Sequence, residues 1–275
     1  MKEGFIMQYF LTDIKKIYSN NFIRIMILFL FILAVVDPVL AYNEPINILE
    51  NPYEFWLLLN SGGIGFKIYR RLIYIFPIIS TGLIYFEERN TSLCGILLTK
   101  VSRRKYFYSK VFAVFLTTFI NFLIPLLLNI LITYMLFDGN ALTTDSFKSF
   151  IPQHGMFCEY LFLKNPIYSC ILYCVLNAFS EALLAVLVLL IHMVYKFNNR
   201  FIAFFVSFIA LCLSTDIVSK VFGPKYDFPF IIQPMVAASC NINITTFNVI
   251  TTYIMFIFIL GIIGLIAIRR NKDIL

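Results

Sequence analysis

The sequence predicts an all-α membrane protein, and three observations support that prediction. Of its 275 residues, 60% are hydrophobic and only 13% are charged, and the mean hydropathy is +0.86. A chain of this composition has too few polar residues for a soluble surface. Six stretches are long and apolar enough to cross a bilayer core, which takes about 20 residues per helix. They lack strand-like alternation, so helices are expected rather than a barrel.

The charges predict the orientation of these spans. The six stretches lie at about 22–42, 68–86, 111–137, 166–195, 201–219 and 248–268. Six spans place both termini on one side of the membrane, and of the 22 Lys and Arg residues, fifteen fall on that side. The fifteen are Lys2, Lys15, Lys16, Arg24, Arg89, Lys100, Arg103, Arg104, Lys105, Lys110, Lys196, Arg200, Arg269, Arg270 and Lys272. Because positive charge gathers in cytoplasmic loops, both termini and the loop at 87–110 are predicted to be cytoplasmic. The net charge of +7 follows from this topology, and nucleic acid is not implied as a partner.

The whole chain, residues 1–275, is predicted to be a single transmembrane domain that begins with an interfacial helix at 1–20. Apolar residues recur there at three- and four-residue spacing, at Met7, Phe10, Leu11, Ile14, Ile17 and Tyr18. On a helix they form one stripe opposite Lys2, Asp13 and Lys16, which suits a helix lying on the inner leaflet. A cleavable signal peptide is not expected, because charges interrupt the apolar pattern. The alternative is a disordered tail whose pattern is accidental.

Several proline and aromatic positions predict local structure. Asp37-Pro38 is expected near the surface, where the first span ends. The outer loop that follows is expected to begin a short helix at Asn51 and to place Trp56 in the headgroup layer. Pro77 and Pro125 are expected to kink the second and third spans.

The most informative segment is the polar loop from Glu87 to Lys110, between two long apolar stretches. Its part from Thr91 to Leu98 can form a short helix with an apolar face. A basic string follows, at Lys100, Arg103, Arg104 and Lys105. An exposed apolar helix beside cations suits a partner protein, whereas juxtamembrane cations alone equally suit anionic lipid.

The pattern of this loop resembles the cytoplasmic coupling loop of type-2 ABC exporter permeases, roughly E-x-x-x-G-T-L-x-x-L-L-x-x-P-V-S-R followed by a Lys at the next helix. The matching positions are Glu87, Leu93, Leu97, Val101, Ser102, Arg103 and Lys110. The family's Gly-Thr pair is replaced by Thr91-Ser92 and its Pro by Lys100. The resemblance extends to the N-terminal interfacial helix, the six spans and short re-entrant helices between the fifth and sixth spans, expected at 228–240.

The resemblance implies a permease subunit that docks a soluble ATP-binding subunit through this loop. The implied docking residues are Glu87, Glu88, Leu93, Leu97, Arg103, Arg104, Lys105 and Lys110. ATP and Mg would bind to that partner, because this chain has no P-loop, so the chain itself is not expected to be an enzyme or to hold a cofactor. A second permease copy or paralogue and membrane lipid are the other implied partners. The resemblance also implies a bacterial plasma membrane as the location. It implies an amphiphilic or hydrophobic cargo, as in the members of this family that export antimicrobial peptides or provide self-immunity to them.

An acidic residue lies near the middle of the fourth span, where it is a functional hypothesis by default. Glu181, accompanied by Asn177, is therefore a candidate contact in a translocation path. The alternative interpretation is that Glu181 joins helices through hydrogen bonds with Asn121 or Asn129. A proton-coupled secondary transporter using Glu181 is the rival class of function.

The cysteines and histidines do not form a ligand set. Six Cys and two His residues include no C-x-x-C pair, so no metal site is predicted. Cys170 and Cys174 are expected to pack within the fourth span. Cys158 and Cys240 both fall in predicted outer segments, and whether they form a disulfide is left open.

Overall fold

The computed structural model describes residues 3–43, 56–58, 63–79, 83–90, 102–137, 157–222 and 245–270. Within these ranges the regular elements are all helical, which confirms the predicted fold class. The helices are α1 (Glu3–Ser19), α2 (Asn21–Asn43), α4 (Ile64–Pro77), α5 (Leu83–Asn90), α7 (Arg103–Leu136), α8 (Glu159–Lys164), α9 (Pro166–Val194), α10 (Arg200–Phe222) and α11 (Thr246–Arg270). The predicted re-entrant segment at 228–240 lies outside the described residues.

Four of the described helices are long and apolar enough to cross a membrane, as judged by length and composition. They cover Asn21–Tyr42, Arg104–Leu136, Pro166–Val194 and Val249–Arg269, which correspond to the first, third, fourth and sixth predicted spans. A shorter apolar helix, Arg200–Leu211, lies at the start of the fifth. The membrane character of the chain is thus confirmed, while six spans remain a prediction.

Two described helices cover the predicted second span, 68–86. The α4 helix ends at Pro77, helical backbone continues to Ile79, and α5 begins at Leu83, while residues 80–82 lie outside the described residues. One continuous second span therefore stays a prediction. Pro38 and Pro125 lie inside α2 and α7, which continue through them. The expected end of the first span at Asp37-Pro38 is therefore wrong, since α2 runs on to Asn43.

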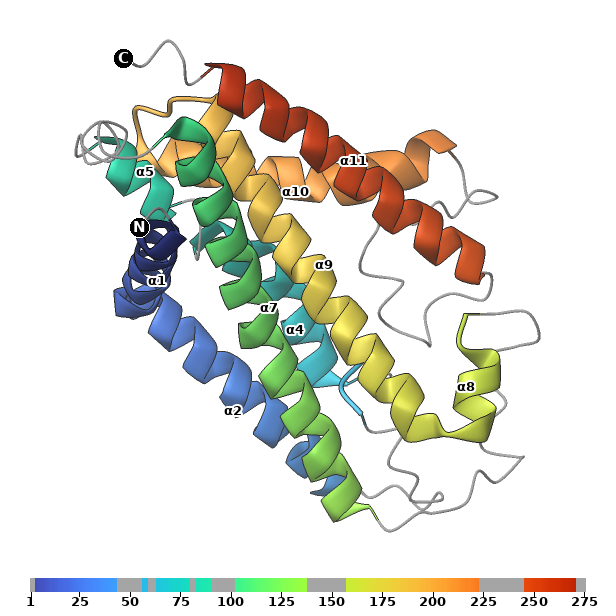
Figure 1. The fold of residues 1–275 in the computed structure, drawn as a ribbon. Coiled ribbons are helices and arrows are strands. Elements are labelled where there is room, and N and C mark those ends of the chain that lie inside the picture. The colour runs from blue at the N-terminus through green and yellow to red at the C-terminus, as the bar shows by residue number, and fades with distance from the viewer. Residues whose placement is uncertain are drawn as a thin grey trace.

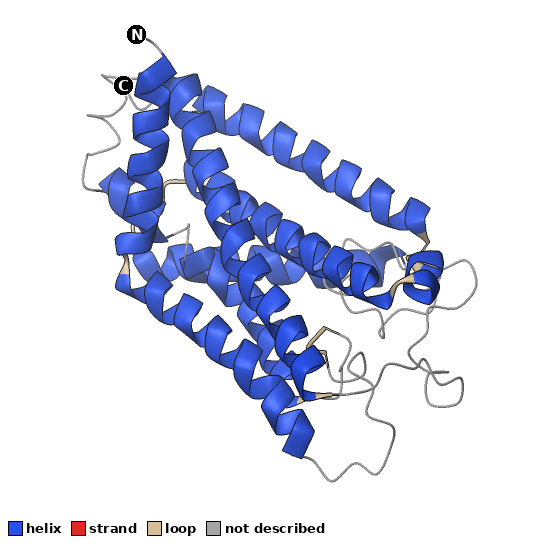
Figure 2. Ribbon diagram, turned by 60° about the horizontal axis from the view of Figure 1, so that its bottom comes forward, coloured by secondary structure: helices blue, strands red, loops and turns tan. Residues whose placement is uncertain are grey.

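Helices α7 and α9 lie side by side at the centre of the bundle (Figure 1). Helix α2 packs along α7, and α11 packs along α9, while α4 lies behind the central pair. In the most apolar window of α9, 78% of the residues are buried, against 28% in α2 and α11. The centre of the core is therefore α9, and α2 and α11 turn most of their apolar surface outward. The view in Figure 2 shows the start of α1 and the end of α11 at the same end of the bundle.

Local sequence explains where two of these helices begin. The side-chain oxygen of Asn20 accepts a hydrogen bond from the Phe22 N–H at 2.9 Å, and that of Asn199 accepts one from the Phe201 N–H at 2.8 Å. Both asparagines immediately precede their helices, where such a bond satisfies a backbone donor that the helix cannot. They separate α1 from α2, and α9 from α10.

Candidate functional site

Four charged side chains from three helices meet at the end of the bundle where the predicted docking loop begins and ends. We call Asp13, Lys16, Glu88 and Lys110 the charge cluster. The Lys110 ammonium lies 2.6 Å from Glu88 Oε1 and 2.6 Å from Asp13 Oδ1. Lys16 lies 2.8 Å from the same oxygen of Glu88. The cluster therefore ties α1 to both α5 and α7.

The charge cluster is buried at its centre and balanced in formal charge. The side chains of Glu88 and Lys110 are only 2% and 7% exposed. Burial raises the pKa of Glu88, but Lys110 and Lys16 outweigh burial and leave the pKa below its ordinary value of 4.5. At Asp13 burial is the stronger effect, so its pKa is raised despite Lys110. The cluster thus favours the charged form of Glu88 over that of Asp13.

Uncharged groups of α7 complete this cluster. The Tyr106 hydroxyl donates to the second oxygen of Glu88 at 3.2 Å. The Lys110 ammonium also lies 5.6 Å from the centre of the Tyr106 ring, within range of a cation–π attraction. Ser109 lies 3.5 Å from the second oxygen of Asp13. Each carboxylate oxygen of Glu88 and Asp13 therefore has a polar or charged partner. Buried carboxylates need such partners to stay charged.

The neighbouring acid, Glu87, makes a different kind of contact. It lies 3.2 Å from Arg200 at the start of α10, and both side chains are nearly half exposed. An exposed pair of this kind contributes little stability. Helix α5 is thus joined to α1 and α7 by a buried acid and to α10 by an exposed one.

The predicted docking loop at 87–110 is shorter than expected. Residues up to Asn90 belong to α5, and those from Arg103 onward form the first turns of α7. Leu93 and Leu97 lie outside the described residues. Of the other predicted docking residues, Glu87, Arg104 and Lys105 are exposed, whereas Glu88 and Lys110 are buried in the charge cluster. Because Glu88 and Lys110 are buried, they cannot themselves contact a docked partner.

The helix predicted at the N-terminus is present as α1, but it is oriented differently from expectation. Asp13 and Lys16, expected on the side away from the apolar stripe, face α5 and α7 through the charge cluster. Leu11, on the stripe, is 53% exposed, while Ile17 is buried. The polar side of α1 packs against protein because complementary charges on the neighbouring helices are available to it.

The intramembrane acid Glu181 is fully enclosed within α9. Its side chain is 1% exposed, and one carboxylate oxygen accepts no hydrogen bond from the described residues. None of the Lys and Arg side chains that the structure describes, a set that does not include Arg70 of α4, forms an ion pair with it. Uncharged polar side chains lie nearby. One turn earlier, Asn177 accepts a hydrogen bond from Tyr69 of α4, and Ser180 pairs with Tyr253 of α11 at 2.7 Å.

The asparagines expected to bond Glu181 have other partners. Asn121 accepts from the Tyr18 hydroxyl of α1 at 2.9 Å. Asn129 donates to the Ala34 carbonyl of α2 at 3.0 Å and accepts from the Leu57 N–H at 3.1 Å. The interpretation of Glu181 as a helix joint through these two residues is therefore wrong. The asparagines do join helices, but on the other side of the bundle.

Sequence reasoning also misplaced two residues near the other end of the bundle. Trp56, expected in the headgroup layer, is 3% exposed and packs in the core. Asp37, expected near the surface, is buried, and its carboxylate packs directly on the backbone of Gly65 in α4. A Cβ on Gly65 would overlap that carboxylate. The only sequence signal for this close approach was the glycine itself.

No group of three or more metal-ligating side chains occurs among the described residues. Cys170 and Cys174 are buried within α9, as predicted. Cys158 is a free thiol whose pKa burial raises to about 11, so it is a weak nucleophile. Cys240 lies outside the described residues.

Comparisons with known proteins add no relative to this picture. No family model matches the chain, and no curated protein or solved structure matches it.

Proposed function

We propose that this chain is the membrane permease subunit of an ATP-driven exporter of the type-2 ABC class. Two permease copies, or this chain and a paralogue, would work with two soluble ATP-binding subunits in a bacterial plasma membrane. ATP and Mg would bind to those subunits. The cargo would be amphiphilic or hydrophobic, such as an antimicrobial peptide that is exported or removed from the membrane.

The observation that carries this proposal is the charge cluster, which joins the two helices on either side of the loop in the sequence. Residues 91–101, which hold most of the coupling-loop pattern, are flanked by α5 and α7. The charge cluster joins these two helices at Glu88 and Lys110 and anchors both to α1. A partner pushing on the loop would therefore move three helices together, because buried and paired charges resist separation.

The exposed cations supply a second line of support. Arg104 and Lys105 project from the first turn of α7, directly after the loop. Exposed charges at the rim of an interface steer and orient a partner more than they tighten its binding. They suit the acidic rim of a docking groove on an ATP-binding subunit.

Co-purification tests this proposal. The chain is expressed with its neighbouring genes, purified in mild detergent, and assayed for an associated soluble ATPase. The ATPase should accompany the unmodified chain and be lost when Arg103→Glu and Arg104→Glu are combined. A Lys196→Glu variant, which reverses an exposed charge between α9 and α10, serves as the control and should retain it. Absence of an ATPase from the unmodified chain in several detergents would overturn the proposal.

The enclosure of Glu181 supports a proton-coupled secondary transporter as the alternative. An acid in a predicted span, with no counter-ion among the side chains that the structure describes, is suited to binding and releasing a proton. If this alternative holds, no ATPase accompanies the chain, and an imposed pH gradient drives proton movement into vesicles containing it. A Glu181→Gln variant would then abolish the proton flux.

A further inference from the structure

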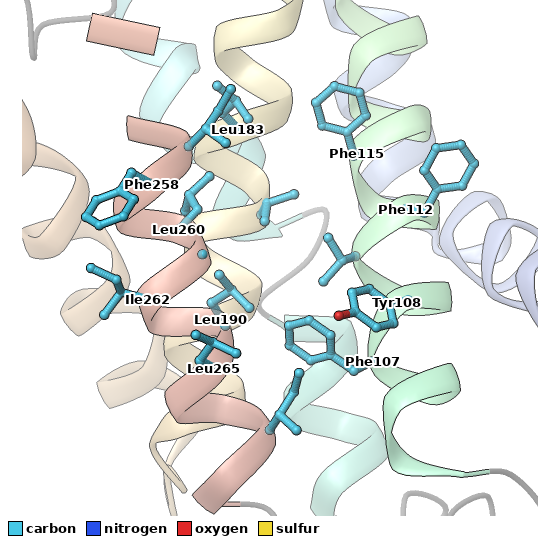
Figure 3. A pocket seen from close by; sticks show the side chains of 16 residues that line it. Phe107, Tyr108, Phe112, Phe115, Leu183, Leu190, Phe258, Leu260, Ile262 and Leu265 are labelled. Atoms are coloured by element: carbon cyan, nitrogen blue, oxygen red, sulfur yellow. The ribbon is translucent and has the colours of Figure 1, made fainter. Parts of the chain in front are cut away.

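A large apolar groove runs between α7, α9 and α11, away from both acidic sites. Its volume is about 920 Å³, within the range of about 300–1,000 Å³ that is typical of ligand pockets. Phe107, Leu190 and Leu265 face one another across it, as Figure 3 shows. Tyr108 provides the only polar side chain among the residues that line it.

Two glycines of α11 shape this groove. A Cβ added to Gly264 would lie 3.2 Å from the Phe107 ring, so α11 and α7 come close at this point. A Cβ added to Gly261, one turn earlier, would meet nothing within 4 Å. The groove is therefore narrow beside Gly264 and wide beside Gly261, and its lining continues past Gly264 to Ile268.

The groove carries positive charge where it approaches the ends of its helices. Arg104 lies one turn before Tyr108 and begins the candidate span of α7, while Arg269 follows the lining residue Ile268 and ends the span of α11. Both arginines are exposed. Cations at the ends of spans lie at headgroup level, where they attract anionic lipid.

These observations favour a lipid over a second copy of the chain as the occupant of this groove. Helices of a second copy would bring a second Arg104 and Arg269 to the same depth, because a membrane dimer is related by an axis along the membrane normal. Like charges would then face each other. An anionic phospholipid instead supplies an apolar chain for the groove and a negative charge for the arginines.

We propose that the groove between α7, α9 and α11 binds an acyl chain of an anionic phospholipid, whose phosphate contacts Arg104 and Arg269. The site does not depend on the exporter proposal, because it requires only that α7 and α11 span the membrane. The test of this lipid site uses no ATPase. A failed lipid test therefore leaves the exporter proposal standing, and a failed co-purification leaves the lipid site standing.

Spin-labelled lipids measure this binding directly. The full chain is reconstituted in phosphatidylcholine vesicles that contain spin-labelled phosphatidylglycerol or spin-labelled phosphatidylcholine. The motionally restricted fraction should be about threefold or more larger for phosphatidylglycerol, given the gain expected per basic residue. Combining Arg104→Gln with Arg269→Gln should bring the ratio close to one, whereas Lys196→Gln should not change it.

A groove-filling variant tests the apolar part of the site. Gly261→Leu places a side chain in the open groove and should reduce the restricted phosphatidylglycerol to the level of phosphatidylcholine. Ile266→Phe, on the exposed side of α11 outside the groove, is the control and should leave it unchanged. Equal restriction of both lipids in the unmodified chain, or an unchanged ratio in Gly261→Leu, would overturn the proposal. Loss of a dimer in Gly261→Leu would also overturn it, since a second copy would then fill the groove.

Discussion

Glu88 and Glu181 are both buried acids, but their surroundings are opposite. Glu88 is paired with Lys16 and Lys110 and receives a hydrogen bond from Tyr106. Glu181 is equally enclosed, yet among the side chains that the structure describes it has no cationic partner, and one of its oxygens accepts no hydrogen bond from them. An acid whose charge is fully compensated is suited to holding helices together. An acid that lacks this compensation adds little to stability and is the better candidate for a functional role.

The largest expected effect comes from breaking the charge cluster at Glu88. Glu88→Gln leaves Lys110 buried with only Asp13, and we expect a loss of about 3 kcal/mol in the free energy of unfolding. Thermal or denaturant unfolding in detergent measures it. Glu87→Gln is the matched control, because it makes the same change at the adjacent, exposed glutamate. Equal losses of unfolding free energy in the two variants would show that burial does not strengthen the ion pairs of Glu88.

The pH dependence of the same variant sharpens the comparison. The pKa of Glu88 is lowered in the folded chain, so its stabilisation is complete above its ordinary value of 4.5. It is lost as the pH falls through the lowered folded pKa. The stability difference between the unmodified chain and Glu88→Gln should therefore stay constant from about pH 7 to about pH 5 and shrink only below about pH 4.5. A difference that already shrinks at pH 6 would contradict the direction of the shift.

A smaller loss is expected at the other acid of the cluster. Burial raises the pKa of Asp13 despite its contact with Lys110, so the charge of Asp13 by itself adds no stability to the folded chain. What Asp13→Asn would lose is the hydrogen bond from Lys110. We expect Asp13→Asn to cost about 1 kcal/mol, less than Glu88→Gln in the same unfolding assay. The opposite ranking of these two variants would mean that α1, and not α5, is the main anchor of Lys110.

The smallest loss of stability is expected at Glu181. Because no side chain that the structure describes forms an ion pair with it, Glu181→Gln should change the free energy of unfolding by less than about 1 kcal/mol in either direction. The variant is nearly isosteric, so packing within α9 is retained. A loss as large as that of Glu88→Gln would show that Glu181 has a compensating partner and would remove the contrast between the two acids.

The sequence predicted the helices better than it predicted their contacts. Long apolar runs identified α2, α7, α9 and α11, because hydropathy depends on each segment alone. Contacts depend on segments that are far apart in the chain, and Lys16 and Glu88 are separated by 72 positions. Periodicity alone therefore assigned the polar side of α1 to the wrong surroundings.

The two predicted sites were accessible to sequence reasoning to different degrees. An acid in the middle of an apolar run stands out, so Glu181 and Asn177 were identified, although the expected partners Asn121 and Asn129 were not the right ones. At the loop, the charges were visible but their burial was not, because nothing local distinguishes Glu88 from Glu87. Only the packing of three helices makes one of them buried and the other exposed.

A double-mutant cycle between Glu88 and Lys110 tests the account most directly. The free energies of unfolding are measured for the unmodified chain, for Glu88→Gln, for Lys110→Met and for the double variant. If the charge cluster joins α5 to α7, the two changes should be coupled by about 2 kcal/mol, with the double variant less damaged than the sum of the single ones. Additive losses, within about 0.5 kcal/mol, would show that the two residues act independently. That result would contradict the proposal that the charge cluster joins the two helices on either side of the docking loop.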